Sequence, residues 1–284
     1  MSSASPFTDL LRLPSGPVAL TEIETDVAPG YDGDKKSGKA DLWAIGEELF
    51  DLQQRLFAGK DDGQRSVLLV LQGMDTSGKG GTLKHTVGLV DPQGVKITSF
   101  KAPTKEELAH DFLWRVRKGV PGPGILGVFD RSHYEDVLIV RVRELAPADE
   151  VERRYGAIND FEKELVDSGV TLVKCMLHIS PEEQKARLLD RLADPTKHWK
   201  YNPGDVDERA RWGHYREAYE IALERTNTEH APWHVIPADK KWYRNLAVGT
   251  LLLETLRRLD PQWPKADFDV AAERERLIAE APIS

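Results

Sequence analysis

The chain has 284 residues, of which 40% are hydrophobic and 30% are charged. These values are ordinary for a globular protein with a sizeable core. The formal net charge of −8 argues against a protein that binds nucleic acid through bulk positive charge. The single cysteine, Cys175, excludes a disulfide within the chain and lies in an apolar run, so we expect a buried thiol and a cytoplasmic protein. We expect neither a signal peptide nor a membrane partner, since no apolar segment reaches membrane-spanning length.

The beginning of the chain changes character near residue 39. Residues 1–38 are rich in Ser, Pro, Gly and Asp, which predicts an irregular N-terminal arm. Residues 39–59 carry apolar side chains at helical spacing, which predicts one amphipathic helix. These side chains are Leu42, Ile45, Leu49, Leu52 and Leu56.

Five short apolar runs follow, and each is typical of a strand buried on both faces of a parallel sheet. They are Ser66–Leu71, Val95–Phe100, Ile125–Phe129, Val170–Leu177 and His234–Ile236. Stretches of helical character alternate with them, at Gly81–Leu89, Lys105–Lys118, Glu135–Glu144, Asp149–Asp167, Pro181–Leu192, Arg209–Arg225 and Trp242–Leu259. This alternation predicts an α/β fold with a five-stranded parallel sheet flanked by helices.

The same pattern predicts three parts of the chain. Residues 39–260 form one domain, in which residues 181–225 form a helical lid that starts with Ser180 as N-cap and Pro181 as first helical residue. Residues 1–38 are the arm. Residues 261–284 form a charged tail that we expect to pack at the periphery.

A phosphate-binding loop is predicted directly after the first strand. Residues 73–79 read G-x-x-x-x-G-K between a buried strand and a helix, which is the context that a P-loop requires. Glycines allow backbone N–H groups to point at phosphate oxygens, and the helix N-terminus adds a positive field. The predicted phosphate-binding residues are Gly73, Gly78, Lys79, Gly80, Gly81 and Thr82. Gly80 stands where such loops usually carry the Ser or Thr that holds Mg²⁺, whereas Asp75 places a carboxylate inside the loop.

A second carboxylate follows the third strand, where parallel sheets present ligand-binding residues. Asp130 is predicted to hold Mg²⁺, with Mn²⁺ as an alternative, together with Asp75. Arg131 is predicted to fork onto a phosphate, and the alternative for both Asp130 and Arg131 is a strand-end salt bridge. His133 is expected to pack or cap rather than to catalyse. Two carboxylates beside one phosphate cradle suit phosphoryl transfer, which depends on positioning and charge neutralisation.

The predicted lid is basic. Arg187 and Arg191 are four residues apart and therefore share a helix face, where they would approach phosphates when the lid closes. Further predicted phosphate contacts are Lys197, Lys200 and, after the fifth strand, Lys240. The alternative is a solvated charged helix with Asp190 and Asp194 as partners. The aromatic stripe of Trp212, Tyr215 and Tyr219 is expected to belong to the core or to a subunit interface.

Four blocks of sequence resemble the family 2 polyphosphate kinases: GMDTSGKGGT, FDRSHYEDVLIVRV, RLADPTKHWKYNPGD and APWHVIPADKKWYRNLAV. The resemblance runs from about residue 40 to residue 260. It implies a thymidylate-kinase-like P-loop fold with a helical lid, a Mg²⁺-dependent transfer of phosphoryl groups between polyphosphate and nucleotides, and a homo-oligomer, most often a tetramer. It further implies functional roles for Asp75, Lys79, Asp130 and Arg131 and identifies Arg187 and Arg191 as lid arginines.

The resemblance implies ADP, AMP or both as acceptors, with adenine or guanine as the base. Residues 134–138 (YEDVL) are most similar to the form that accepts both AMP and ADP. Two alternatives stay open. An ATP-dependent nucleoside or nucleotide kinase is disfavoured by Gly80 and by the basic lid, and a catalytically silent polyphosphate or nucleotide sensor is disfavoured by the two carboxylates.

Overall fold

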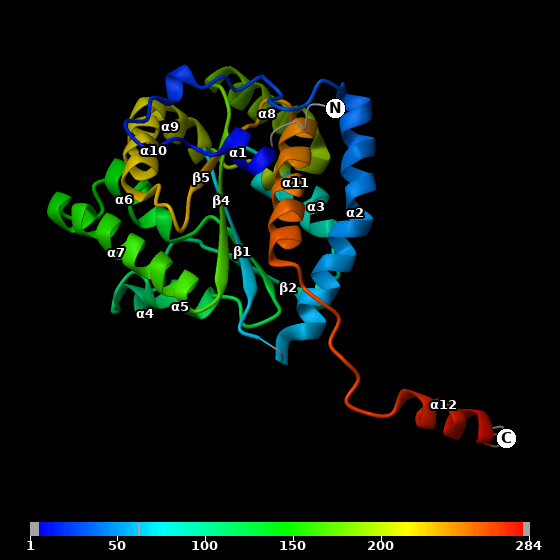
Figure 1. The fold of residues 1–284 in the computed structure, drawn as a ribbon. Coiled ribbons are helices and arrows are strands. Elements are labelled where there is room, and N and C mark those ends of the chain that lie inside the picture. Colours follow the sequence, from blue (N-terminus) through cyan, green and yellow to red (C-terminus); the bar gives the residue numbers. More distant parts are fainter. Residues whose placement is uncertain (1–5, 62, 281–284) are drawn as a thin grey trace.

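The computed structural model describes residues 6–61 and 63–280 (Figure 1). Five parallel strands form one sheet in the order β2-β3-β1-β4-β5. Their bounds are β1 (Ser66–Gln72), β2 (Val95–Ser99), β3 (Leu126–Asp130), β4 (Val170–His178) and β5 (Trp233–Pro237). The predicted fold class is therefore confirmed, and each strand lies close to its predicted range. Because β1 is central, the loop that follows it opens between β3 and β4, where open α/β sheets bind ligands.

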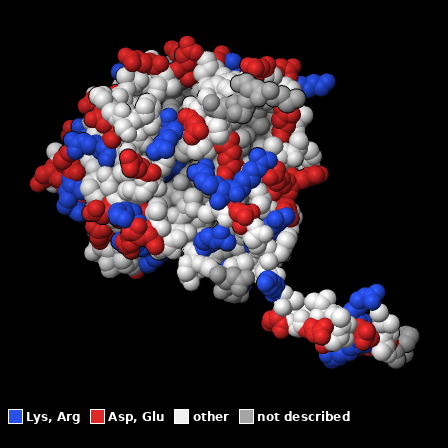
Figure 2. Space-filling model, in the orientation of Figure 1, with Lys and Arg blue, Asp and Glu red and all other residues white. Residues whose placement is uncertain are grey.

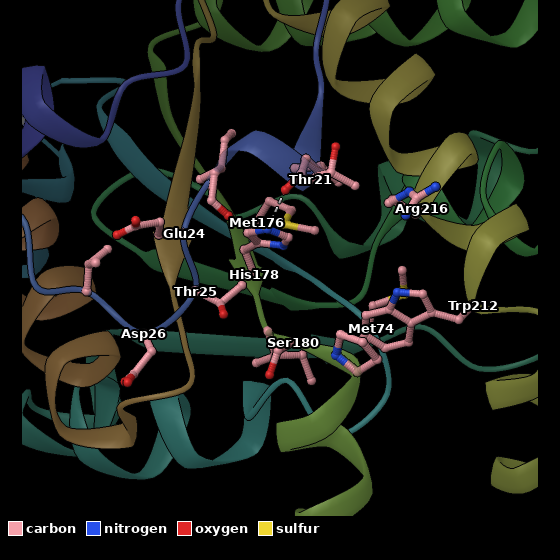
Figure 3. A pocket seen from close by; sticks show the side chains of 15 residues that line it. Thr21, Glu24, Thr25, Asp26, Met74, Met176, His178, Ser180, Trp212 and Arg216 are labelled. Carbon is pink, nitrogen blue, oxygen red and sulfur yellow. Dashed lines mark hydrogen bonds between the residues drawn. The ribbon is translucent and has the colours of Figure 1, made fainter.

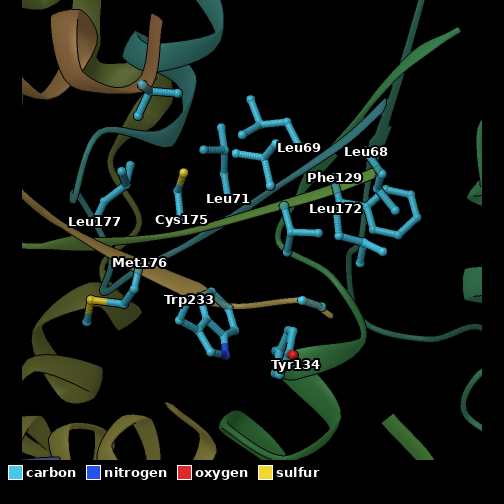
Figure 4. Close-up of a cluster of buried hydrophobic side chains, with 14 of the residues drawn as sticks. Leu68, Leu69, Leu71, Phe129, Tyr134, Leu172, Cys175, Met176, Leu177 and Trp233 are labelled. Carbon is cyan, nitrogen blue, oxygen red and sulfur yellow. The ribbon is translucent and has the colours of Figure 1, made fainter. Parts of the chain in front are cut away.

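The strands are apolar because four of them are buried on both faces. All residues of β1 and β5 are buried, and Figure 4 shows leucines of β1 beside Phe129 of β3 and Cys175 of β4. Cys175 is 0% exposed, as predicted, and burial raises the pKa of its thiol. Only the edge strand β2 differs from the predicted buried run, since Ile97 on it is exposed.

Helices cover both faces of the sheet (Figure 1). One face carries α2 (Lys35–Ala58), α3 (Lys79–His85) and α11 (Lys241–Leu259). The other carries α7 (Ala148–Asp167) and α10 (Trp212–Thr226). Above the carboxyl ends of the strands lie α8 (Pro181–Ala193) and α9 (Gly204–Ala210). The predicted cap of α8 is confirmed, because the Ser180 hydroxyl accepts a hydrogen bond from the Glu183 backbone N–H at 3.1 Å.

Several predicted helices are shorter than expected. The stretch 105–118 divides into α4 (Lys105–Leu108) and α5 (Trp114–Gly119), because a turn closed by Trp114 N–H and Asp111 C=O at 2.9 Å interrupts it. The stretch 135–144 is a 3₁₀ turn (His133–Asp136), capped by the Ser132 side chain, and the short α6 (Ile139–Val142). The stretch 81–89 ends α3 at His85 and continues as a 3₁₀ turn (Val87–Leu89), and 209–225 is shared between α9 and α10.

The N-terminal arm covers the β5 edge of the sheet. Among residues 6–34 it contains α1 (Phe7–Leu11) and a 3₁₀ turn (Leu20–Glu22) and is otherwise irregular, whereas residues 35–38, predicted to belong to the arm, are part of α2. Arg12 forms an isolated antiparallel bridge with His234 of β5, and Leu13 N–H donates to the Trp233 carbonyl at 2.8 Å. The arm therefore pairs with strand edges that would otherwise be open.

The predicted packing of the C-terminal tail is wrong. Residues 262–280 are all exposed, and α12 (Val270–Ala279) projects away from the domain (Figures 1 and 2). The physical reason lies at the end of α11, where Asp260 adopts a left-handed backbone (φ 45°) and Pro261 prevents the helix from continuing. Within the described residues, no helix has the length and apolar character needed to cross a bilayer.

Candidate active site

The loop between β1 and α3 is a tight cradle. Gly78 has φ of +106°, and a Cβ atom there would collide with the guanidinium of Arg244 from α11. Thr76 also adopts a left-handed backbone, with φ of 64°. Such conformations in non-glycine residues occur where the surroundings enforce them, often at functional sites. The predicted P-loop is thus held in shape by side chains that pack against it from outside.

Lys79 lies at the centre of the candidate site. Its Nζ donates to the Gly73 carbonyl at 2.8 Å, which folds the side chain back over the loop. Desolvation and the nearby Arg131 charge lower the Lys79 pKa, whereas the carboxylates of Asp75, Glu135 and Asp130 raise it. The predicted residues Asp75, Asp130 and Arg131 therefore all act electrostatically on this ammonium group.

Arg131 contacts one candidate metal ligand and directly follows the other in sequence. Arg131 Nη2 donates to Asp75 Oδ1 at 3.0 Å, and Asp130 directly precedes Arg131 at the end of β3. Asp130 pairs in register with Leu71 of β1 and Ser99 of β2, so it stands at the same edge as the P-loop. The strand-end salt bridge considered for Arg131 is present, and its partner is the other candidate metal ligand.

Glu135 is a site residue that sequence reasoning did not select. Its Oε2 lies 3.8 Å from Arg131 Nη1, one helical turn away in sequence, which was the available signal. When the Gln72 side-chain oxygen faces Ser132, the Gln72 side-chain nitrogen donates to Glu135 Oε1 at 3.2 Å. Burial raises the Glu135 pKa, and the Arg131 and Lys79 charges oppose that rise.

Arg187 of the lid holds the P-loop from above. It is 6% exposed, and its Nη1 donates to the carbonyls of Thr76 at 2.8 Å and Ser77 at 2.9 Å. Its Nη2 donates to the Ala238 carbonyl at 2.5 Å. The neighbouring Gln184 donates to the Asp75 carbonyl at 3.0 Å. Arg187 is thus brought to the phosphate cradle, but its donors already face backbone carbonyls.

The other predicted lid and strand-end cations lie further out. Arg191 donates to the Lys200 carbonyl at 2.9 Å and lies 3.5 Å from Asp205. Lys197 is paired with Asp194 at 2.8 Å, and Lys200 lies over the Trp199 ring. Lys240 is bound to Asp26 of the N-terminal arm, with Nζ 2.9 Å from its carbonyl oxygen.

Two residues of distant helices complete the cradle. Arg244 donates to the Ser77 carbonyl at 3.1 Å, and burial lowers its pKa to about 9. Tyr219, expected in the core or an interface, is buried, and its hydroxyl accepts a hydrogen bond from Gly73 N–H at 3.1 Å. The aromatic stripe of Trp212, Tyr215 and Tyr219 therefore reaches the P-loop through Tyr219. Arg244 was not selected from the sequence, although it lies in the block APWHVIPADKKWYRNLAV that carries the resemblance.

Two cavities adjoin the P-loop. One, of about 390 Å³, has charged lining residues from the P-loop, the turn after β3 and the lid, including Asp75, Arg131, Arg143 and Glu208. The other, of about 560 Å³, lies between the arm and α10 and is mainly apolar. Figure 3 shows Met74 and Trp212 together in the second cavity, and both also line the first. The charged cavity is the one suited to phosphates.

The carboxylates suit a hard divalent cation. Asp130 makes no hydrogen bond or ion pair through its side chain within the described residues, and the Asp75 side chain is 35% exposed. Mg²⁺ is usually bound by one or two carboxylates, with substrate phosphates and water as the remaining ligands. No group of three or more acidic, His or Cys side chains forms a complete cage among residues 6–61 and 63–280. The donor set therefore fits a cation shared with the substrate.

Comparisons with known proteins agree with this geometry. A family model described as polyphosphate kinase 2 matches residues 32–264. The chain is 46% identical over 254 residues to an AMP/ADP-polyphosphate phosphotransferase from Meiothermus ruber, covering 89% of this chain and 94% of that protein. An ADP-polyphosphate phosphotransferase from Rhodopseudomonas palustris is 40% identical over 273 residues, or 92% of each chain. The crystal structure of a polyphosphate kinase 2 from Arthrobacter aurescens TC1 is 55% identical, with a TM-score of 0.94 and 98% of each chain covered.

Proposed function

Because this chain belongs to the polyphosphate kinase 2 family, we propose that it transfers phosphoryl groups between inorganic polyphosphate and a nucleotide. The relatives from Meiothermus ruber and Rhodopseudomonas palustris are named for AMP/ADP and ADP, respectively. We assign AMP and ADP as acceptors here, with adenine or guanine as the base. We also propose a homo-oligomer, with a tetramer favoured.

The observation that carries the proposal is the convergence of opposite charges at one sheet edge. Arg131 lies 3.0 Å from Asp75, and the charges of Asp75, Glu135 and Asp130 each act to raise the pKa of Lys79. The fixed positive charges match anionic phosphate oxygens, and the carboxylates match a cation. A site of this kind preorganises charge, which is the main contribution that proteins make to phosphoryl transfer.

Asp75 and Asp130 are the residues that would hold Mg²⁺, or Mn²⁺ in its place. When bound, the ion would offset negative charge on the phosphate oxygens. Asp75 has to release part of its contact with Arg131 to do so. Arg131 is then free to turn its guanidinium toward the transferring group.

In the direction of nucleotide synthesis, an oxygen of the acceptor's terminal phosphate forms a new bond to the terminal phosphorus of polyphosphate. The bond between that phosphorus and the bridging oxygen breaks, and the shortened polyphosphate leaves with the bridging electron pair. Lys79 and Arg131 offset the negative charge on the transferring group. Gly78, Gly80 and Gly81 would supply backbone donors to the phosphates. The predicted contacts of Gly73 and Thr82 are disfavoured, because the Gly73 N–H already donates to the Tyr219 hydroxyl and the Thr82 N–H to the Gly78 carbonyl.

The lid residues have two different proposed roles. Arg187 orders the loop by binding the Thr76 and Ser77 carbonyls. Arg191, Lys197 and Lys200 would contact the polyphosphate chain after exchanging their present partners. Lys240 would join that path by leaving Asp26. Closure over the phosphates excludes water and so suppresses hydrolysis.

The test is to mix the purified protein with AMP or ADP, Mg²⁺ and polyphosphate in the absence of ATP and to measure the higher nucleotide. Formation of ADP or ATP supports the proposal. Phosphorylation that occurs only with added ATP supports an ordinary nucleotide kinase, and binding without turnover supports a sensor. Either of these two results would reject the proposed reaction.

A further inference from the structure

A pair of opposite charges is buried beneath the turn that carries Arg131. Lys174 lies on β4 and Glu162 on α7, and both are 0% exposed. Lys174 Nζ donates to Glu162 Oε2 at 2.7 Å and to the Thr226 carbonyl at the end of α10 at 2.8 Å. The pair therefore joins the sheet to both helices on this face.

The same pair holds the two residues that follow Ser132. The Tyr134 hydroxyl donates to Glu162 Oε1 at 2.6 Å and accepts from Lys174 Nζ at 2.9 Å. His133 Nε2 lies 3.2 Å from Glu162 Oε1. Tyr134 and His133 are both fully buried. Their side chains thus extend from the catalytic turn into the core and end on one carboxylate.

Arg131 needs such support because its backbone is strained. Its φ is 63°, a left-handed conformation that a residue with a side chain rarely adopts. Strain of this kind persists only when neighbouring structure enforces it. On one side, Arg131 N–H donates to the Leu71 carbonyl of β1 at 3.2 Å. On the other side, the buried Ser132 pairs with the Gln72 amide at 3.0 Å, and the next two side chains, His133 and Tyr134, reach Glu162 in the core.

Stability alone does not account for the buried pair. Removing two charges from water is costly, and well-packed apolar residues of similar volume usually stabilise a core equally well or better. Lys174 is also surrounded by aromatic rings, with Nζ 4.8 Å from the Trp233 ring centroid. What an apolar pair would not supply is directional bonds to the Tyr134 hydroxyl and the His133 ring.

We propose that Glu162 and Lys174 are positioning residues for phosphoryl transfer, which hold Arg131 in place through Tyr134 and His133. This inference rests on the proposed function and adds a device that contacts no substrate. Loss of the pair lets the turn relax, and the Arg131 guanidinium then leaves its place beside Asp75. Misplacement of a charge-stabilising group lowers kcat more than it changes substrate binding.

The test replaces both charges together, as Glu162→Gln with Lys174→Met, so that no unpaired charge is left in the core. We expect kcat for polyphosphate-dependent ATP formation to fall about 10- to 100-fold, with KM for polyphosphate and the melting temperature close to the parent values. In an Arg131→Ala background the same double change should cost less than about threefold, because residues that act through one another are non-additive.

A matched control lies on the same helix. Lys163 and Asp167 form an exposed ion pair of α7 at 2.9 Å, and Lys163→Met with Asp167→Asn should leave kcat unchanged. If the core variant does not fold, Tyr134→Phe removes only the hydroxyl and should lower kcat in the same way. A folded variant with parental kcat, or an equally large loss in the Arg131→Ala background, would overturn the inference.

A second readout is independent of turnover. The crystal structure of Tyr134→Phe should show the Arg131 guanidinium displaced from Asp75, and an unchanged contact would contradict the positioning role. A wild-type protein that forms no ATP from polyphosphate would reject the proposed reaction, while the crystal structure would still decide whether the buried pair positions Arg131.

Discussion

The Nη2 atom of Arg131 lies 3.0 Å from the Oδ1 atom of Asp75, so a phosphate-binding cation and a candidate metal ligand neutralise each other. Both side chains are partly exposed, at 41% and 35%, so water screens the pair and its contribution to stability is small. A phosphate and a divalent cation can therefore separate the pair at little cost. The contact keeps both groups aimed at the same point until substrate arrives.

Lys79→Ala and Asp130→Asn should fold normally yet lose nearly all polyphosphate-dependent ATP formation. Each removes a charge that acts on the transferring group, and the expected fall in turnover is about 10²–10³-fold. The measurement is initial ATP production from ADP and polyphosphate at saturating Mg²⁺. Lys84→Ala, an exposed lysine of the same helix α3, is the matched control and should keep the parental rate. Normal rates in either site variant would break the site assignment.

Gly78→Ala should destabilise the protein and abolish phosphate transfer. The positive φ costs about 1–2 kcal/mol for a residue with a Cβ, and that Cβ would displace Arg244 from the Ser77 carbonyl. Gly80→Ala is the comparison for stability, since its Cβ would meet no atom within 4 Å. Chemical denaturation should show a loss for Gly78→Ala and none for Gly80→Ala. Equal unfolding free energies would contradict the described loop geometry.

Arg187→Ala should lower the stability of the protein, whereas Arg191→Ala should lower only its activity. Arg187→Ala removes its donors from the carbonyls of Thr76 and Ala238 and leaves Ser77 with Arg244 alone, so we expect a loss of about 3 kcal/mol in unfolding free energy. Arg191 is partly exposed, and its alanine variant should unfold within about 0.5 kcal/mol of the parent while losing activity with polyphosphate. Urea titrations and ATP formation measured side by side separate the two. A stable Arg187→Ala protein would refute the assigned anchoring role.

His234 should make the protein less stable in acid. Burial, with smaller effects from Arg12 and Arg258, lowers the pKa of His234 from 6.5 to about 4 in the folded state. Between pH 6.5 and pH 4 the His234 ring therefore binds a proton in the unfolded chain but not in the folded one. The free energy of unfolding falls as the pH drops through this range. The full effect is about 3 kcal/mol.

The measurement for His234 compares urea unfolding of the parent and His234→Asn at pH 7, 5 and 4. Asparagine retains a group that can bond the Lys174 carbonyl, which His234 Nδ1 contacts at 3.2 Å. The variant should lose less stability on acidification than the parent. Parallel pH profiles would show that His234 does not carry the effect.

The strands and the phosphate loop could be predicted because their signals are local. A buried parallel strand is a continuous apolar run, and G-x-x-x-x-G-K after such a run specifies a cradle. The break near Asp111 was missed because helical spacing continues through it. Contacts of Arg187 and Arg244 with the loop were missed for another reason. They join residues more than one hundred positions apart, and only the tertiary fold brings them together.

The position of the C-terminal tail could not be predicted from the sequence. The charged tail was predicted to pack at the periphery, yet even its apolar residues Leu277 and Ile278 are 68% exposed. Spacing within a helix reveals that an apolar stripe exists but not whether a surface lies within reach of it. The tail is directed outward by the left-handed backbone conformation of Asp260, and no pattern of side chains predicts that conformation.

The outward course of α12 makes this end of the chain a natural attachment point. A tag, fluorophore or second enzyme joined beyond residue 280 would hang from a helix that projects away from the domain (Figure 1). The linker between Asp260 and α12 would act as a spacer, and the strand ends that carry Asp75 and Asp130 would stay clear of the cargo. Immobilisation through this helix should leave the open side of the catalytic cleft facing the solution.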